Sequence, residues 1–103
     1  MDFDTLNDFI VNRGFCIINL RNFDFKTTRG EISDFYSKSN IHISKIEIYN
    51  IKNDSIQANI HIDNKETLQK VIEKGRGYCG GNKYKFLWRI SKDNYALPAW
   101  NKQ

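Results

Sequence analysis

The chain has 103 residues, a net charge of +4 and a sequence pI of about 9.1. This length predicts a single domain, residues 1–103, with a core of modest size. Hydrophobic residues make up 40% and aromatic residues 14%, which is typical of a globular chain and excludes a disordered one. The mild positive charge favours an anionic partner without requiring one.

Cysteine and histidine are sparse and widely spaced. Cys16 and Cys79 form no C-x-x-C pair, and His42 and His61 lie far apart. The paired spacing of zinc ligands is therefore missing, and we expect neither a metal nor a cofactor. Two reduced thiols and an acidic N-terminus without a signal-peptide pattern predict an intracellular protein, nuclear or cytoplasmic. No apolar run is long enough to span a membrane, so we expect no membrane partner.

Hydrophobic spacing predicts three helices. The first covers residues 1–13, whose apolar side chains recur at helical spacing. The second begins at a capping box formed by Thr28 and Glu31. The third follows Asp63, the expected N-cap, and ends before Gly75.

Four segments are predicted to be strands. Residues 15–20 are almost all apolar, which is typical of a central strand. Residues 43–51 and 55–62 both alternate between apolar and polar side chains, and the short polar turn between them predicts a hairpin. Residues 76–82 are expected to form a loop before the last strand, residues 83–90.

The order of these elements predicts the fold class. After the first helix it runs strand, helix, strand, strand, helix, strand, which is the split β-α-β arrangement of an α+β protein. Four antiparallel strands would carry two helices on one face, because each helix has a single apolar stripe. The other side of the sheet stays open unless the first helix or the tail covers it.

Residues 14–91 resemble an RNA-recognition motif (RRM). The segment FCIINL is similar to the first-strand hexamer of that family, and SIQANIHI lies where its third-strand octamer belongs. EISDFYSK is similar to its first helix, and YCGGNKYKF to the run into its fourth strand. The resemblance implies an RRM-like sandwich with an extra N-terminal helix (1–13), an RRM core (14–91) and a C-terminal tail (92–103). It also implies non-catalytic binding of single-stranded RNA.

The chain departs from this family at three stacking positions. The family places aromatic rings where this sequence has Cys16, Gln57 and Asn59. A stacked base contributes about 1–3 kcal/mol, so the missing rings predict weak RNA binding of low specificity. Such a domain would act within a larger ribonucleoprotein assembly.

Strand alternation predicts which residues line the open side of the sheet. It places Cys16 and Ile18 there, together with polar residues able to contact base edges and phosphates. An antiparallel sheet often faces water, so plain solvation of these residues is the alternative. The predicted RNA-binding residues are Lys45, Tyr49, Gln57, Asn59, His61, Lys85 and Arg89.

The loop after the third helix suggests a second function. Peptide-binding domains that resemble RRMs carry Arg-x-Phe in this loop and have acidic residues on the first helix of the RRM core. Together these residues bind a tryptophan of a protein partner. This chain has Arg76-Gly77-Tyr78, and Glu31 and Asp34 lie on the corresponding helix. The alternative prediction is therefore a protein-protein interaction module that has lost RNA binding. A flexible glycine-rich loop would explain the same residues without a partner.

Enzymatic activity and a small-molecule substrate are not expected. The sequence contains no phosphate-binding glycine loop, no G-x-S-x-G and no H-E-x-x-H. Two flanking segments remain open in role. The tail, with Tyr95 and Trp100, would either cover the sheet or stack on a ligand, and the first helix would pack on the domain or bind a partner.

Overall fold

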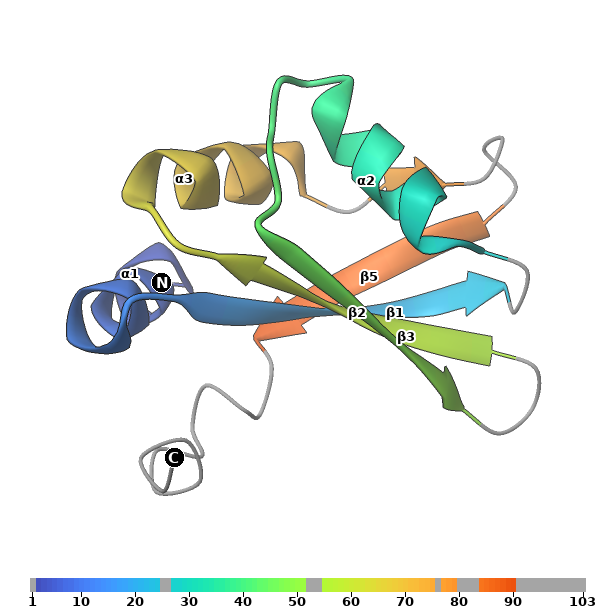
Figure 1. Cartoon of the computed structure of the whole chain (residues 1–103), viewed down its shortest axis with the longest axis horizontal. Helices are drawn as coiled ribbons and strands as arrows, with labels where there is room; N and C mark the ends of the chain where they lie inside the picture. Colours follow the sequence, from blue (N-terminus) through green and yellow to red (C-terminus); the bar gives the residue numbers. More distant parts are fainter. Residues whose placement is uncertain (1, 25–26, 52–54, 76, 80–83, 91–103) are drawn as a thin grey trace.

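The computed structural model describes residues 2–24, 27–51, 55–75, 77–79 and 84–90, the last two segments by their backbone alone. Helices and antiparallel strands together make up this part of the chain, which confirms the predicted α+β class (Figure 1). The tail and Arg76 lie outside the described residues. The elements are α1 (Asp2–Arg13), β1 (Cys16–Asp24), α2 (Arg29–Ser37), β2 (Lys45–Ile51), β3 (Ser55–Ile62), α3 (Lys65–Lys74), β4 (Gly77–Cys79) and β5 (Tyr84–Ile90).

The strands are ordered β2-β3-β1-β5-β4, and each neighbouring pair is antiparallel. The nearly apolar β1 lies between β3 and β5, as expected of a strand whose side chains avoid water. Figure 1 shows α2 and α3 together over one face of the sheet, with α1 beyond the start of β1. There α1 contacts both α3 and β1, so the predicted first helix packs on the domain.

The short strand β4 was not expected from the sequence. Residues 76–82 are predicted to be a loop, but Gly77–Cys79 pairs with β5, with Tyr78 opposite Lys85. Three residues among glycines give no periodic signal. Only the neighbouring edge of β5 makes an extended backbone favourable here, because it offers hydrogen-bond partners.

The predicted orientation of β1 is wrong by one residue. Cys16 and Ile18 were expected on the open side, but they lie opposite Ile62 and Ile60 of β3 and are fully buried in the core. A run of apolar residues contains no alternation, so the sequence alone cannot tell which of its side chains point into the core and which point to the open side of the sheet. Pairing with β3 assigns them, since residues directly opposite in an antiparallel pair share a face. Cys16 therefore does not occupy the stacking position assigned to it.

The core lies between the sheet and the helices. Burial raises the pKa of the Cys16 thiol to about 12, although the nearby Arg13 acts in the opposite direction. This thiol therefore stays protonated and unreactive at neutral pH. The largest side chains that are fully buried are Tyr36, Phe23, Leu6, Ile18, Leu20, Ile32, Ile60, Ile62, Leu68 and Val71.

The caps of α2 and α3 follow the sequence with one exception. The capping box of α2 forms as predicted, with the Glu31 backbone N–H donating to Thr28 Oγ1 and the Thr28 N–H donating to the Glu31 carboxylate. In α3 the N-cap is Asn64 and not Asp63. Asn64 Oδ1 accepts the backbone N–H of Thr67 at 2.8 Å, because the helix begins one residue later than expected.

This assignment of the cap is testable by substitution. Asn64→Ala removes the acceptor of a first-turn N–H and should lower the free energy of unfolding by about 1 kcal/mol. Asp63→Ala is the comparison, since it removes no acceptor of a first-turn N–H, only an exposed hydrogen bond from Asn64 Nδ2 and a charge that favours the helix N-terminus by a smaller amount. Urea denaturation measures both losses, and a larger loss for Asp63→Ala would contradict the assignment.

Candidate functional site

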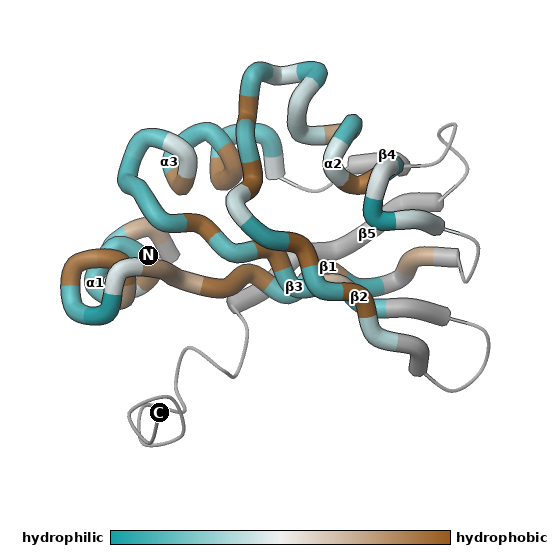
Figure 2. The backbone as a smooth tube through the Cα atoms, viewed as in Figure 1, coloured by the Kyte–Doolittle hydropathy of each residue, from teal (hydrophilic) through white to brown (hydrophobic). Residues whose placement is uncertain are grey.

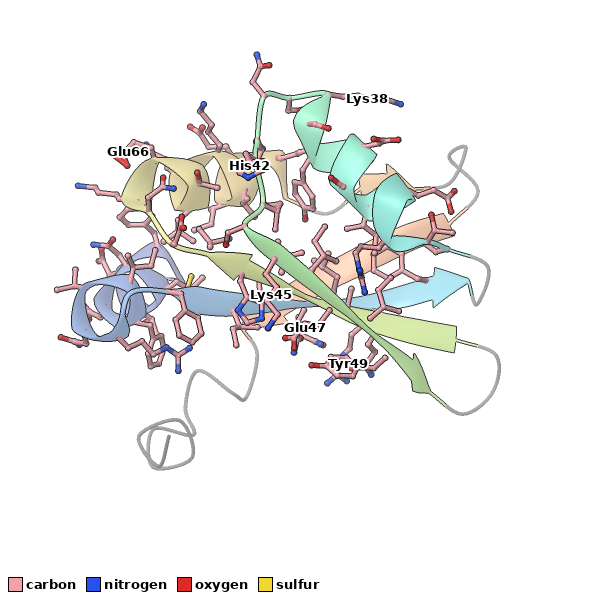
Figure 3. The ribbon with its side chains drawn as sticks, viewed as in Figure 1. Lys38, His42, Lys45, Glu47, Tyr49 and Glu66 are labelled. Carbon is pink, nitrogen blue, oxygen red and sulfur yellow. The ribbon has the colours of Figure 1, made fainter. Side chains whose placement is uncertain are left out.

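The face of the sheet away from α2 and α3 carries a group of polar side chains, which we call the open face. Figure 3 shows Glu47 and Tyr49 of β2 turned away from these two helices. Glu47 lies opposite Asn59 in the β2–β3 register, and Asn59 lies opposite Asn19 in the β1–β3 register, so all three belong to this face. Its described members are Ile17, Asn19, Arg21, Lys45, Glu47, Tyr49, Gln57, Asn59 and His61.

Two asparagines connect the strands at the centre of the open face. Asn19 Nδ2 donates to Asn59 Oδ1 at 2.8 Å, and a longer contact of 3.4 Å reaches Gln57 Oε1. Asn19 Oδ1 accepts from Arg21 Nε at 2.6 Å. Asn19 and Asn59 are almost fully buried, and these bonds offset the cost of removing their amides from water.

The chain of hydrogen bonds continues into β2. Asn59 Nδ2 donates to the Tyr49 hydroxyl oxygen at 3.4 Å, and the Tyr49 hydroxyl interacts with the Glu47 carboxylate, the smallest of the effects that lower the pKa of that carboxyl. Because a carboxylate only accepts, the tyrosine hydroxyl is the donor. We call the series Arg21, Asn19, Asn59, Tyr49 and Glu47 the polar relay. It is directed from a guanidinium cation to a carboxylate anion, so each bond polarises the next in the same sense.

Glu47 also pairs with a histidine and a lysine. His61 Nε2 lies 2.6 Å from Glu47 Oε1, and Lys45 Nζ lies 3.8 Å from Glu47 Oε2. Since the carboxylate accepts, His61 Nε2 carries the hydrogen. The hydrogen bond from His61 lowers the pKa of Glu47 most; the charges of His61 and Lys45 and the Tyr49 bond add to this, against the opposing effect of partial burial.

An aromatic ring that the sequence prediction overlooked adjoins the open face. Phe15, just before β1, stacks on the His61 ring with centroids 5.5 Å apart. Arg13, the last residue of α1, lies over Phe15 at 4.4 Å from the ring centroid and over Phe9 at 5.0 Å. Its Nε also donates to the Phe15 carbonyl at 3.0 Å. These contacts tie the end of α1 to the open face.

The predicted RNA-binding residues differ in accessibility. The Lys45 side chain is 62% exposed and Tyr49 is 41% exposed, whereas Asn59 is only 4% exposed. Gln57 and His61 are half-buried. The side chains of Lys85 and Arg89 lie outside what the structure describes, although the backbone register places Arg89 opposite Asn19.

Asn19 and Arg21 are members of the open face that the sequence analysis did not single out. Arg21 lies beyond the predicted end of the first strand at residue 20, and β1 in fact continues to Asp24. Asn19 belongs to the FCIINL segment, which is predicted as a nearly apolar strand. A polar residue inside such a strand is the signal that could have identified it, because a buried amide requires a partner.

The residues predicted to bind a peptide are only partly brought together. Glu31 is occupied in the capping box of α2, while Asp34 is exposed on the same helix. α2 contacts β4, whose backbone includes Tyr78. The Tyr78 side chain lies outside the described part of the chain.

Comparisons with known proteins found no match: no family model, no curated protein and no solved structure matches this chain. Within the described residues, no group of three or more His, Cys, Asp and Glu side chains is arranged to hold a metal ion. None of the helices described is both long enough and apolar enough to cross a bilayer.

The polar relay predicts an unequal cost of two amide substitutions. Asn19→Ala leaves Asn59 Oδ1 and the Arg21 guanidinium without this partner in a nearly buried site, and should cost about 1–3 kcal/mol of unfolding free energy. Gln57→Ala is the control, since Gln57 is half-buried and contacts the relay only at 3.4 Å. It should cost less than about 1 kcal/mol. Equal losses in urea denaturation would show that the relay does not stabilise the fold.

The lowered pKa of Glu47 predicts a stability difference that depends on pH. Its ionised form stabilises the folded state above the ordinary value of 4.5, and this contribution is lost as the pH falls through the lower folded pKa. The free energy of unfolding that Glu47→Gln loses relative to the unsubstituted protein should therefore be largest above pH 4.5 and smaller in more acidic solution. Urea unfolding between pH 7 and pH 3 measures it. Glu73→Gln, an exposed carboxylate of α3, controls for the lost charge, and a Glu47→Gln deficit independent of pH would refute the prediction.

Proposed function

We propose that this domain is an RRM-like module that binds single-stranded RNA, without catalysis, on its open face. The strand order β2-β3-β1-β5 and the placement of α2 and α3 on one face support the RRM-like assignment, which adds α1 and β4 to the pattern. The observation that carries the function is Tyr49, an exposed aromatic ring held by the polar relay on the same strand face as the highly exposed Lys45.

In this proposal Tyr49 is the stacking platform. Its hydroxyl accepts from Asn59 and interacts with the Glu47 carboxylate, so the ring is oriented from below while its exposed part faces the ligand. A ring that is already ordered loses little conformational entropy when a base stacks on it. Asn59 thus supports the platform and does not read a base edge, a change from the role predicted for it.

The charged residues around Tyr49 account for weak binding. Lys45 supplies a mobile cation for phosphates, and Gln57 is the amide of the open face available for a base edge. Lys85 and Arg89 are proposed to extend the phosphate contacts along β5. The Glu47 carboxylate lies at the centre and repels phosphate, although Lys45 offsets its charge and His61 donates a hydrogen bond to it. Binding of this kind is weak, sensitive to salt and tolerant of sequence.

A protein-interaction module is the second candidate. The contact of α2 with β4 favours it, because it brings the helix of Asp34 beside the strand of Tyr78. Glu31 is engaged in the helix cap, which leaves Asp34 as the carboxylate for a basic peptide, with Arg76 and Tyr78 from the following segment. Loss of a captured protein on Tyr78→Ala, with RNA affinity unchanged, would favour this function over the first.

RNA affinity of Tyr49 variants tests the first candidate. Fluorescence anisotropy with a labelled degenerate single-stranded RNA should show Tyr49→Ala weakening binding about 5- to 150-fold, the equivalent of one stacked base. Tyr49→Phe keeps the ring and should bind within a few-fold of the unsubstituted protein. Lys45→Ala should reduce the slope of log affinity against log salt by about 0.7.

Lys70→Ala is the matched charge control, because Lys70 is exposed on α3, the helix layer opposite the open face. It should leave affinity and salt slope unchanged. Equal affinities of Tyr49→Ala and the unsubstituted protein would overturn the proposal.

A further inference from the structure

The outer edge of β2 is unpaired within the described part of the chain. β2 stands at one end of the strand order and has β3 as its only strand neighbour there. The strand at the other end, β4, has three residues, whereas β2 has seven. An edge of this length presents a row of backbone donors and acceptors that another strand can pair with.

This edge has few of the features that normally prevent pairing. The register of β2 with β3 runs from Lys45 to Ile51 without a bulge, and the strand contains no proline. Hydrophobic and hydrophilic residues alternate along it, as Figure 2 shows. Ile46 and Ile48 pack against the core but are only partly buried, so a neighbouring strand would remove further apolar surface from water.

We propose that two copies of this chain associate through their β2 edges, antiparallel, with Ile46 opposite its counterpart on the two-fold axis. A two-fold interface brings the same strand of each copy together. In this register Lys45 of each copy lies opposite Glu47 of the other, giving two symmetric ion pairs on the open face. Ser44 and Ile48 are opposite each other on the face that carries the core.

The charges of β2 select this register over its neighbours. A shift that centres the pair on Lys45 places two lysines opposite each other, and one centred on Glu47 places two carboxylates together. Like charges directly opposite are destabilising, whereas opposite charges stabilise. Shifts that would swap the two faces are excluded by the side-chain alternation of a strand.

Lys45 is free to make the contact between copies. Its ion pair with Glu47 of the same chain is long, 3.8 Å, and its side chain is 62% exposed, so turning toward a second chain costs little. A seven-residue edge buries less area than a standard stable interface. The dimer should therefore form only at high protein concentration, and its sheet would carry both open faces on one side. This proposal does not depend on RNA binding.

A charge-exchange experiment tests the register, using sedimentation equilibrium without RNA. Lys45→Glu places two carboxylates opposite each other at both symmetric positions, and Glu47→Lys places two ammonium groups there. Each variant alone should dimerise at least about tenfold more weakly than the unsubstituted protein. An equimolar mixture of the two variants restores opposite charges at both positions and should return the dimer. A mixture no more associated than its components would overturn the proposal, as would a monomeric unsubstituted protein at millimolar concentration.

A cross-linking measurement covers the case in which Glu47→Lys disturbs the fold through the polar relay. Ile46→Cys places two thiols opposite each other on the two-fold axis and should give a disulfide-linked dimer under mild oxidation. Val11→Cys, at a residue 73% exposed on α1, is the matched control for collisional cross-linking. Faster cross-linking at position 46 supports the β2 edge, and equal rates at both positions contradict it.

Discussion

The antiparallel register between β1 and β3 is the constraint on which the rest of the structure depends. It sets Asn19 opposite Asn59 and Cys16 opposite Ile62. Because opposite residues share a face, this one alignment sends half of β1 into the core and joins two amides on the other side. A shift of one residue would expose Ile18 and bury Asn19 against apolar neighbours, and the unpaired amide would oppose such a shift.

The polar relay makes this register specific as well as stable. In each asparagine the side-chain oxygen accepts from the side of Arg21 and the side-chain nitrogen donates toward the side of Glu47. The amides of Asn19 and Asn59 therefore make these hydrogen bonds in one orientation only. The relay ends on Glu47, whose carboxylate also receives the hydrogen of His61. His61 in turn stacks on Phe15, which Arg13 covers. The central sheet and the end of α1 are thereby held by one connected group of contacts.

This arrangement separates supporting residues from accessible ones. The buried amides hold Tyr49, while the most exposed of the described groups on the open face are the tyrosine ring and the Lys45 ammonium. Both lie on β2, which is also the long unpaired edge among the strands described. A proposed ligand surface and a proposed interface therefore share one strand, and pairing of two edges would bring two Tyr49 platforms into one continuous sheet.

Local sequence determined the helices, the Thr28–Glu31 capping box and the alternating hairpin of β2 and β3. These features define the α+β class. They can be predicted because caps and hydrophobic periods depend on residues within a few positions of one another. Local sequence did not determine the faces of β1, since a run of apolar residues looks the same in either orientation. It also missed β4, which forms only because β5 supplies its hydrogen-bond partners. The polar relay joins residues up to 40 positions apart. Contacts of that kind exist only once the strands have paired, so the tertiary structure alone decided which polar residues support the open face and which are exposed on it.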